Sequence, residues 1–382
     1  MKKVCHMTTV HQRYDVRILR KECVSLARHG YDVTLLVDDN LKDECIDGVK
    51  IVSISSNARN RIERIFYSSK IMLQKAYEIN ADIYHFHDPE LIPTGVALTK
   101  KGKKVIYDSH EDTPGDIKER YWIPKYLRGI ISFLFARYEN CAAQKFNAII
   151  TVTPFIVERF KIYNRNTFMI TNYPLLTAFN GVTNSVKHNQ VCFTGMVDPI
   201  WSHQIVLQAL EGTNVKYVVA GKVVNNYLEY LQQCVGKENL EYVGLLPFNE
   251  VSNIHRSSIA GLAILKPAPN DKNNEGTLGN QKIFEYMNSG IPVICSNLKL
   301  WKEIVTKYNC GVCVDFDSPQ QIHDTILDLV NNPQKAHLMG LNGRKAVEQE
   351  FNWQTQEKIL LNLYESVINN FEHNKKERDV HD

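Results

Sequence analysis

Residues 275–297, EGTLGNQKIFEYMNSGIPVICSN, predict the fold more sharply than any other part of the sequence. The stretch opens with polar, turn-forming residues and continues with apolar residues that share one face at helical spacing: Ile283, Phe284 and Met287. Gly290 and Pro292 end that helix, and 293–295 predict a short buried strand. A loop that leads into a helix presents unpaired backbone N–H groups, so we expect a phosphate-binding loop, with Glu285 one turn along the helix in reach of a ribose.

The rest of the chain alternates short apolar runs with helical patterns. The sequence has 382 residues, 44% of them hydrophobic and 23% charged, which is typical of a soluble protein with two domains. The alternation predicts an α/β fold of two doubly wound, Rossmann-like halves, each with a parallel sheet. The expected strands are 3–10, 31–37, 49–54, 83–86, 104–107 and 148–152 in the first half, and 191–194, 216–220, 240–243, 260–265, 291–295 and 311–314 in the second.

A polar, turn-rich segment separates the two halves. We therefore expect an N-terminal domain of residues 1–176, a linker of 177–190 and a second domain of 191–351. The remaining residues, 352–382, predict a long amphipathic helix that ends near residue 371, followed by a charged tail. Sheets of this kind bind ligands at the carboxyl ends of their strands.

The segment KIFEYMNSGIPVICSN, residues 282–297, resembles the nucleotide-sugar segment of the retaining glycosyltransferases of family 4. The resemblance extends to His87-Asp88-Pro89 and to residues 108–111. It implies the GT-B fold, in which two Rossmann-like domains face each other across a cleft. The N-terminal domain of that fold binds the acceptor and the C-terminal domain binds the nucleotide-sugar donor. The final helix would pack back on the first domain.

The resemblance also implies a donor site in the second domain. In the family two glutamates flank the loop; Glu285 matches the second, which binds the ribose, whereas the first falls on Thr277. Many members carry an arginine and a lysine after the first strand of this domain, and here Met196 and Ser202-His203 stand there instead. The backbone amides of 277–282 and two lysines would then stabilise the leaving diphosphate without metal. The predicted donor-binding residues are Gly195, Lys266, Glu275, Thr277, Leu278, Gly279, Asn280, Lys282 and Glu285.

In the first domain, three polar segments each follow a predicted strand: 10–18, 85–90 and 107–111. Since the carboxyl ends of parallel strands meet at one edge of the sheet, they predict an active site there. By resemblance, His110 would hydrogen-bond the donor sugar and Glu111 would help place the acceptor hydroxyl. The predicted catalytic residues are His87, Asp88, His110 and Glu111, and the predicted acceptor or cleft residues are His11, Asp15, Arg17 and Asn172.

The segment 10–18 also has a structural interpretation. Asp15 can cap the following helix, with Arg17 paired to it. The segment stands where a Rossmann protein carries its glycine loop but has no glycine before Gly30, which argues against NAD binding.

Three sequence patterns suggest metal ligands, and each has a plainer interpretation. His85 and His87 point the same way from a strand, but with Asp88 they make three ligands and the sequence shows no fourth nearby. Asp315-Phe316-Asp317 precedes Ser-Pro, where a helix N-cap is expected, and Cys310-x-x-Cys313 lacks a second pair. We therefore expect no metal cofactor.

Charge and cysteine content limit the partners and the compartment. A net charge of +3 does not predict nucleic-acid binding, and nine scattered cysteines without a secretory signal predict a reduced, cytoplasmic protein. Residues 116–146 and 59–79 interleave aromatic with basic side chains, which suits an anionic lipid surface, although amphipathic core helices look similar. We expect peripheral contact with the inner face of the cytoplasmic membrane.

These patterns and the resemblance predict a retaining hexosyltransferase. The donor would be a UDP- or GDP-sugar, and the acceptor a hydroxyl of a lipid-linked saccharide in cell-surface polysaccharide biosynthesis, such as capsule or O-antigen. One alternative is a UDP-sugar 2-epimerase on the same scaffold. The other is a non-catalytic nucleotide-sugar-binding subunit of a glycan assembly complex, which the missing first glutamate and cationic pair keep open.

Overall fold

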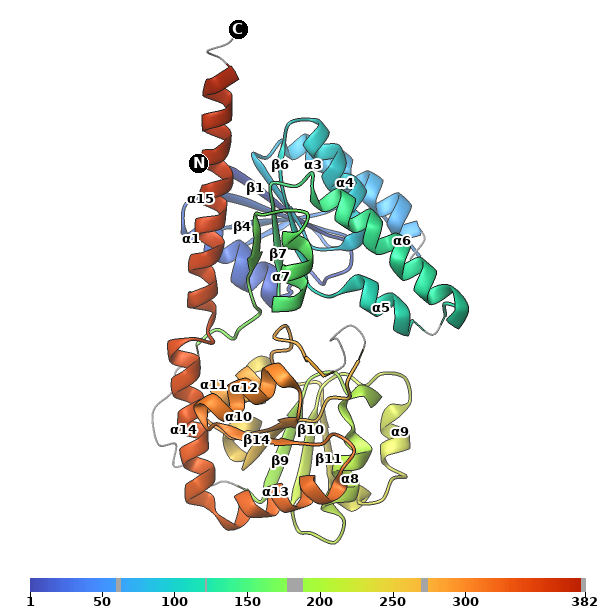
Figure 1. The fold of residues 1–382 in the computed structure, drawn as a ribbon, viewed down its shortest axis with the longest axis vertical. Coiled ribbons are helices and arrows are strands. Elements are labelled where there is room, and N and C mark those ends of the chain that lie inside the picture. The colour runs from blue at the N-terminus through green and yellow to red at the C-terminus, as the bar shows by residue number, and fades with distance from the viewer. Residues whose placement is uncertain (60–62, 121, 177–187, 269–273, 379–382) are drawn as a thin grey trace. The chain divides into compact units, whose positions relative to one another are not determined.

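The computed structural model describes residues 1–59, 63–120, 122–176, 188–268 and 274–378. The chain divides into two compact units, a first unit of Met1–Asn172 with Trp353–Asp382 and a second unit of Tyr173–Asn352 (Figure 1). Each unit has its own largely parallel sheet with helices around it, which confirms the predicted α/β fold with two doubly wound sheets. Most of the predicted linker, 177–187, lies outside the described residues.

The sheet of the first unit has eight strands in the order β3-β4-β2-β1-β5-β6-β7-β8, and all neighbours are parallel except the edge pair β3 and β4. Strand β4 was predicted, but β3 and its antiparallel pairing were not. Its turn is Asp47-Gly48, both at positive φ, the signature of a tight hairpin. The strands are β1 (Lys3–Thr8), β2 (Asp32–Val37), β3 (Glu44–Ile46), β4 (Val49–Ser53), β5 (Ile83–Phe86), β6 (Lys104–Ser109), β7 (Ala148–Thr151) and β8 (Thr167–Met169).

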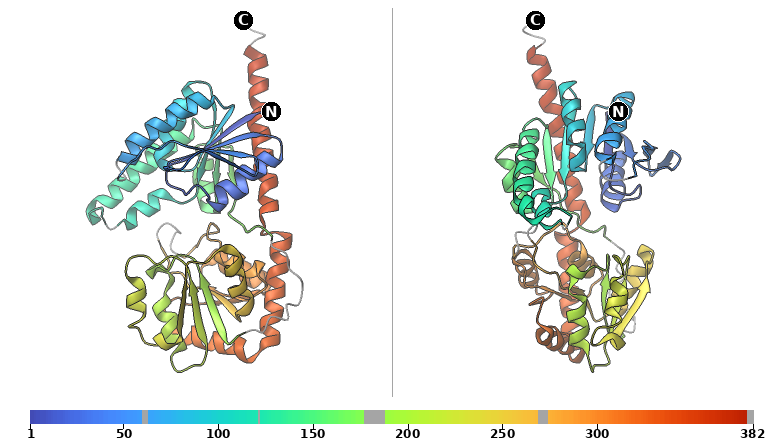
Figure 2. Two further views of the ribbon diagram at one scale, coloured as in Figure 1. Left: turned by 180° about the vertical axis from the view of Figure 1, so that it is seen from behind. Right: turned by 90° about the vertical axis from the view of Figure 1, so that its right-hand side faces the viewer.

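Helices cover both faces of this sheet (Figures 1 and 2). Successive residues of β1 point to opposite faces: Val4 joins the core under η1, α1 and α15, and Cys5 joins the core under α3, α4, α6 and α7. The helical segments are η1 (Val16–Cys23), α1 (Val24–Arg28), η2 (Arg64–Ser68), α3 (Ser69–Ile79), η3 (Pro89–Leu91), α4 (Ile92–Lys100), α5 (Thr113–Glu119), α6 (Lys125–Ala143), α7 (Pro154–Lys161) and α15 (Trp353–Arg378).

The helix predicted over residues 16–29 is wound in two ways. Its first half, η1, has the wide i→i+5 hydrogen bonding of a π-helix, and α1 continues it as an α-helix. Asp15 caps η1, its carboxylate accepting a hydrogen bond from the Ile18 backbone N–H at 2.9 Å. Because the wide turn brings residues five apart onto one side, Arg17 and Glu22 lie next to each other beneath the sheet edge, 3.1 Å apart.

The long helix α15 belongs to the first unit. It continues to Arg378, beyond its predicted end, and Figure 1 shows it running along that unit. Its inward residues Trp353, Leu360, Leu363, Tyr364 and Val367 are buried in the core with η1 and α1. Burying side chains of this size contributes roughly 1.5–3 kcal/mol each, so α15 is an integral part of the first unit's core.

The second unit has a six-stranded parallel sheet in the order β11-β10-β9-β12-β13-β14. Its strands are β9 (Gln190–Thr194), β10 (Lys216–Ala220), β11 (Leu240–Gly244), β12 (Ala260–Ala263), β13 (Val293–Ser296) and β14 (Gly311–Val314). Its helical segments are η4 (Pro199–Trp201), α8 (His203–Leu210), α9 (Tyr227–Leu231), η5 (Lys237–Asn239), α10 (Phe248–Ser257), α11 (Lys282–Asn288), α12 (Lys299–Tyr308), α13 (Pro319–Asn331) and α14 (Pro333–Gln349).

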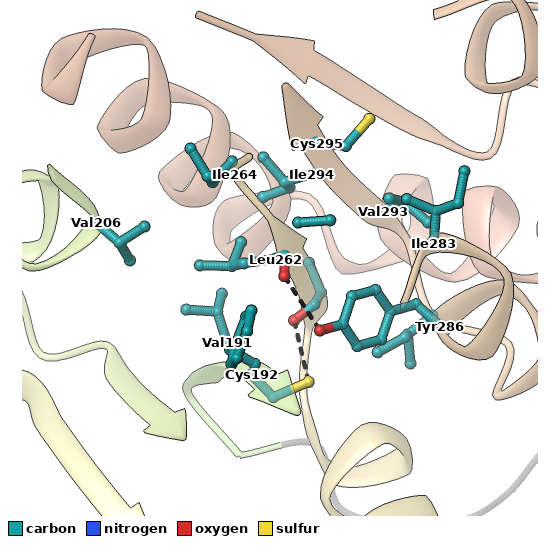
Figure 3. Packing of buried hydrophobic residues seen from close by; sticks show 14 of the residues in the cluster. Val191, Cys192, Val206, Leu262, Ile264, Ile283, Tyr286, Val293, Ile294 and Cys295 are labelled. Atoms are coloured by element: carbon teal, nitrogen blue, oxygen red, sulfur yellow. Dashed lines mark hydrogen bonds between the residues drawn. The ribbon is translucent and has the colours of Figure 1, made fainter. Parts of the chain in front are cut away.

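Helix α11, predicted from the opening stretch, is anchored to the middle of this sheet (Figure 3). The hydroxyl of Tyr286 donates to the Leu262 carbonyl at 3.1 Å, and the ring lies against Gly261, where an added Cβ would come within 2.2 Å of it. Gly290 follows the helix at φ +70°, as expected of a residue that ends it. This packing fixes the helix and therefore the end of the preceding loop.

Candidate functional site

The three polar segments predicted in the first unit meet at one edge of its sheet. They follow β1, β5 and β6, which are neighbours in the sheet. His11 Nδ1 lies 3.0 Å from Asp88 Oδ1, and His87 Nδ1 lies 3.2 Å from His110 Nε2. Residues predicted from three separate strand ends thus form one cluster.

Asp88 organises the turn after β1. Its Oδ2 accepts hydrogen bonds from the Thr8 hydroxyl at 2.8 Å and from the Thr9 backbone N–H at 2.6 Å, and its Oδ1 contacts His11. Burial raises the pKa of Asp88, but the hydrogen bonds from His11, Thr9 and Thr8 outweigh it and lower that pKa to about 2. Asp88 raises the pKa of His11 in turn, against the lowering effect of burial. Asp88 is therefore a carboxylate held in a fixed position, and His11 beside it is protonated more readily than an ordinary histidine.

A second, deeper ion pair lies under His110. The fully buried carboxylate of Asp108 accepts from the Arg17 guanidinium at 2.9 and 3.1 Å and contacts His110 Nε2 at 3.0 Å. Burial alone would raise the pKa of Asp108, but the charge of Arg17 holds it well below its usual value. Arg17 also donates to the Ile170 carbonyl and contacts Glu22. It pairs with these carboxylates rather than with Asp15, and acts by positioning His110.

A cavity of about 650 Å³ in the first unit opens onto this cluster. One wall is polar and is formed by His11, His87, Asp88, His110 and Glu111. The opposite wall is largely apolar and comes from η2, α5, α6 and the segment that joins the last two: Ile65, Ile117, Ile123, Ile131 and Phe135. The chemistry-bearing side chains therefore face a pocket that also has room for an apolar group.

Asn172 does not line this cavity. Its side-chain oxygen accepts a hydrogen bond from the ammonium of Lys21 at 2.7 Å. Lys21 is a buried residue of η1, so Asn172 compensates a buried positive charge at the end of the segment that leads out of the first unit.

In the second unit, glycines end the strands that lead to the predicted donor site. Gly195 follows β9 at φ +134° and Gly221 follows β10 at φ +138°, a region that favours glycine. A Cβ on Gly221 would lie 1.8 Å from the Gly195 carbonyl oxygen, and one on Gly195 would lie 2.4 Å from Lys282 Nζ. The two glycines let the strand ends come together and bring the Lys282 ammonium to the end of β9.

Lys282 is held against aromatic rings. Its ammonium lies 4.4 Å from the ring centre of Trp201 and 4.9 Å from that of Phe193. Burial lowers the pKa of Lys282 to about 8. Within the described part of the chain no carboxylate forms an ion pair with it, so it presents a desolvated positive charge for an anion.

The loop before α11 is shaped by its own side chains. The Thr277 hydroxyl accepts from the Gly279 N–H at 3.0 Å, and Asn280 Oδ1 accepts from the Lys282 N–H at 3.1 Å. Leu278 is buried. Glu275 forms an ion pair with Lys299 at 3.0 Å. Glu275 therefore has a structural partner on the neighbouring helix α12.

The remaining predicted donor residues lie near Lys282. Glu285, in the first turn of α11, has a half-buried side chain, as does Lys266 just after β12. Burial and the charges of Lys282 and Lys266 lower the pKa of His203 to about 3. His203 itself is buried, with its Nδ1 2.8 Å from the Tyr217 hydroxyl, and is not a substitute for the missing cationic pair.

Two suspected metal motifs have ordinary structural roles. Ser318, next to Asp317, caps α13 by accepting from the Gln321 N–H, and the sulfur of Cys313 lies 3.8 Å from that of Cys295. Among the described residues, the groups with geometry for a metal ion lie in the first unit and include neither motif.

Sequence reasoning missed several polar residues beneath the first cluster: His6, Glu22 and Tyr364. Asp108 stood in a predicted polar segment, but its pairing with Arg17 was not predicted. The signal for two of the missed residues was present. Glu22 stands three positions after Leu19 and four after Ile18, on the helix face expected to be buried, and His6 interrupts an apolar strand. Buried polar residues at such positions require partners, which only the fold could name.

Comparison with known families agrees with this architecture. The family described as Glycosyltransferase Family 4 matches residues 16–168, and the family described as Glycosyl transferases group 1 matches residues 178–346. The chain belongs to the group 1 glycosyltransferases of family 4. The first match covers most of the first sheet without β1, the second covers the whole second sheet, and together they confirm the resemblance seen at residues 282–297.

Individual relatives of this glycosyltransferase are distant. Spore coat protein SA of Bacillus subtilis is 26% identical over 191 residues, 46% of this chain and 48% of the relative. The chain spans about half the length of the curated relatives it matches.

Solved structures share the fold over almost the whole chain. Sucrose-phosphate synthase from Thermosynechococcus elongatus has a TM-score of 0.77 at 13% identity and covers 96% of this chain and 99% of its own. Anabaena Alr3699/HepE in complex with UDP has a TM-score of 0.70 at 14% identity, and the match covers 96% of this chain and 100% of the Anabaena chain. These likenesses support the GT-B fold. None of the described helices combines the length and apolar character needed to cross a membrane.

Proposed function

We propose that this glycosyltransferase moves a hexosyl unit from a nucleoside diphosphate sugar to a hydroxyl of a saccharide acceptor and retains the anomeric configuration. The first unit would bind the acceptor and the second the donor. The observation that carries the proposal is the cavity of the first unit, where His87, Asp88, His110 and Glu111 form a wall beside an apolar surface. A site of this kind suits an acceptor with a polar and an apolar end.

The second unit supports a nucleotide-sugar donor. Lys282 is a desolvated cation at the end of β9, and Lys266 and the loop amides stand near it. In our proposal these groups stabilise the negative charge that develops on the leaving diphosphate, and Glu285 binds the ribose. The donor is a UDP- or GDP-sugar; the similar Anabaena structure holds UDP.

The first unit supplies the groups near the transferred sugar. His110 is held by Asp108, which Arg17 fixes in turn, so its imidazole has a defined position at the cavity wall. We assign it a hydrogen bond to the donor sugar. Glu111 is exposed at the same wall and would orient the acceptor hydroxyl.

The apolar wall favours a lipid-linked acceptor. Tyr126, Ile130, Phe133 and Leu134 lie exposed on one side of α6, whose Ile131 and Phe135 line the cavity. Exposed Lys125 and Arg137 flank them. Such a surface suits the inner face of the cytoplasmic membrane, where cell-surface polysaccharide such as capsule or O-antigen is assembled. Of the two predicted contact segments, Tyr121 and residues 60–62 lie outside the described residues.

The donor site is tested by thermal unfolding with UDP, with GDP and without ligand. A nucleotide at about one hundred times its dissociation constant should stabilise the chain by roughly 2.7 kcal/mol. We expect one of the two nucleotides, UDP or GDP, to raise the unfolding temperature of the wild type. The same nucleotide should raise the unfolding temperature of Glu285→Ala much less. Exposed Glu303→Ala, on α12 of the same unit, is the matched control and should respond like the wild type. No shift with either nucleotide would contradict the donor site.

Turnover separates the proposal from its alternatives. With the matching nucleotide sugar and a lipid-linked saccharide, we expect a product that keeps the anomeric configuration of the donor. Release of free sugar without acceptor would instead support a UDP-sugar 2-epimerase. Nucleotide-sugar binding without turnover would support a non-catalytic subunit, the alternative suggested by Thr277 at the place of the family's first glutamate.

A further inference from the structure

Four buried side chains converge beneath the active-site cluster of the first unit. They are His6 of β1, Glu22 of η1, His85 of β5 and His87 just after β5. All four side chains are fully buried. Each offers one ligand atom to a common centre, and these atoms lie within 4.8 Å of one another.

The distances between the ligand atoms fit a tetrahedral ion. His6 Nδ1 lies 3.0 Å from His87 Nε2, and Glu22 Oε2 lies 4.0, 3.9 and 4.0 Å from the facing nitrogens of His6, His85 and His87. An ion bound at about 2.0–2.1 Å in a tetrahedron separates its ligand atoms by about 3.4 Å. These four distances bracket that value, and the remaining pairs of ligand atoms lie within 4.8 Å of each other.

Each ligand also has the outer contact that metal ligands require. The Tyr364 hydroxyl lies 3.1 Å from His6 Nε2 and 2.9 Å from His85 Nδ1, the ring nitrogens that face away from the centre. His87 Nδ1 faces Asp108 at 3.4 Å and His110 at 3.2 Å. Glu22 Oε1 contacts the Arg17 guanidinium at 3.1 Å. Such contacts fix the tautomer and the orientation of metal-bound histidines.

Of the inner atoms, His6 Nδ1 and His87 Nε2 lie within hydrogen-bond distance of each other, at 3.0 Å, and the others have no comparable partner among the described residues. In the part of the chain that the structure describes, neither Glu22 oxygen nor His85 Nε2 has a hydrogen bond of good geometry. The three imidazoles crowd together, with ring centres 4.3, 5.2 and 4.6 Å apart. Without a cation, Glu22 Oε2 and His85 Nε2 would stay buried without a partner, which is costly.

We propose that His6, Glu22, His85 and His87 bind one divalent transition-metal ion, with Zn²⁺ as the best match. Three imidazoles and one carboxylate in a closed tetrahedron are typical ligands of zinc. The ion would be structural, because four protein ligands leave no position for a substrate. It would hold His87 and, through it, His110 at the cavity wall, and it would tie α15 to the sheet through Tyr364. This replaces the expectation of a metal-free protein.

The direct test is the metal content of the full chain, purified without chelator and without a metal-affinity column. Elemental analysis should find about one zinc ion per chain, and the ion should be lost in Glu22→Gln and in His85→Gln. His203→Gln and His255→Gln remove buried histidines of the second unit and should keep the ion. Stoichiometric zinc that survives in both Glu22→Gln and His85→Gln would overturn the assignment.

A second measurement covers the case in which the ligand variants fail to fold. The wild type, unfolded with chelator and refolded with Co²⁺, should take up one ion and show the strong visible absorption of tetrahedral cobalt. Tyr364→Phe should keep the site but weaken its affinity about 10–100-fold. A wild type that carries no metal, takes up neither Zn²⁺ nor Co²⁺ on refolding and unfolds at the same temperature with and without chelator would refute the proposal.

Discussion

The two sheets of this molecule share a topology of parallel strands and differ in what their carboxyl ends carry. The first ends in imidazoles and carboxylates, with His110 above Asp108 and His11 beside Asp88. The second ends in Gly195 and Gly221, which leave space for Lys282. An edge of titratable groups can hold and orient reacting hydroxyls, whereas an edge of glycines and one cation makes room for a diphosphate. The difference teaches that one scaffold can carry two chemically different edges, and in the proposed function these edges serve two tasks.

Among the substitutions that test this comparison, His110→Ala should have the largest effect, and it should act on turnover rather than on nucleotide affinity. Removing a group that acts on the developing charge should lower the turnover number about 10²–10³-fold. The affinity for the nucleotide should stay within a factor of two, because in the proposed function the nucleotide binds the other unit. Initial rates and nucleotide titrations check this, with exposed His337→Ala as the control. An equal loss of turnover and nucleotide affinity would break the division of tasks.

At the second edge, Gly221→Ala should reduce stability. Its Cβ would overlap the Gly195 carbonyl oxygen, and φ +138° is already unfavourable for alanine, so we expect a loss of roughly 2–4 kcal/mol. Gly212→Ala is the matched control: it also has a positive φ, +71°, but its Cβ would meet nothing within 4 Å, so only about 1 kcal/mol should be lost. Denaturant unfolding measures both. Equal losses would mean that the close approach at the strand ends is unimportant.

The charge at the second edge makes a pH prediction. Burial lowers the pKa of Lys282 from 10.5 to about 8, so the ammonium is charged below pH 8 and loses its charge above it. Nucleotide affinity should therefore fall as the pH rises through about 8, by up to about tenfold per pH unit. The same shift means that the folded chain binds this proton less tightly than the unfolded chain. Stability should accordingly rise with pH between 8 and 10.5.

Calorimetric titrations at pH 7 and pH 9 give the affinity difference. Lys282→Met should bind more weakly at pH 7 and should show little dependence on pH. If the nucleotide affinity of Lys282→Met still depends steeply on pH, another group causes the effect. Lys282 would then not be the cation that binds the nucleotide.

The smallest expected effect concerns the surface next to the first edge. Phe133→Ser removes a large exposed apolar side chain from α6 and should weaken binding to vesicles containing anionic lipid about 3–10-fold. Tyr230→Ser, an exposed aromatic residue of the second unit, should leave vesicle binding unchanged. Cosedimentation measures the bound fraction of both. Equal losses would show that the apolar surface of α6 has no special role.

Much of the fold could be predicted because it follows from local patterns. Apolar runs placed most strands, and Gly290 marked the end of α11. The short edge strands β3 and β8 were missed because three residues carry too little periodicity. The sequence also did not reveal that the helix after β1 is wound as a π-helix, which sets Glu22 beside Arg17.

In the candidate site, too, residues in local motifs could be predicted, whereas contacts between residues far apart in the chain could not. Motifs at strand ends identified His87, Asp88 and His110. The sequence argument against a metal at His85 and His87 considered only residues nearby in the chain, whereas the fold also brings His6 and Glu22 to these histidines. Tyr364 lies 279 positions from His85 and 358 from His6, and periodicity carries no information over such separations.

The discontinuity of the first unit has a consequence for synthesis on the ribosome. Its sheet is complete once residue 172 has been made, but one face waits for α15, which follows the whole second unit in the chain. Until then the nascent chain exposes the apolar surface that Leu360, Leu363 and Tyr364 later cover. The second unit is continuous and can fold first, although it is translated later. A chain cut before Trp353 should therefore depend on chaperones, and a ribosome-stalled series should gain protease resistance in the order second unit, then first.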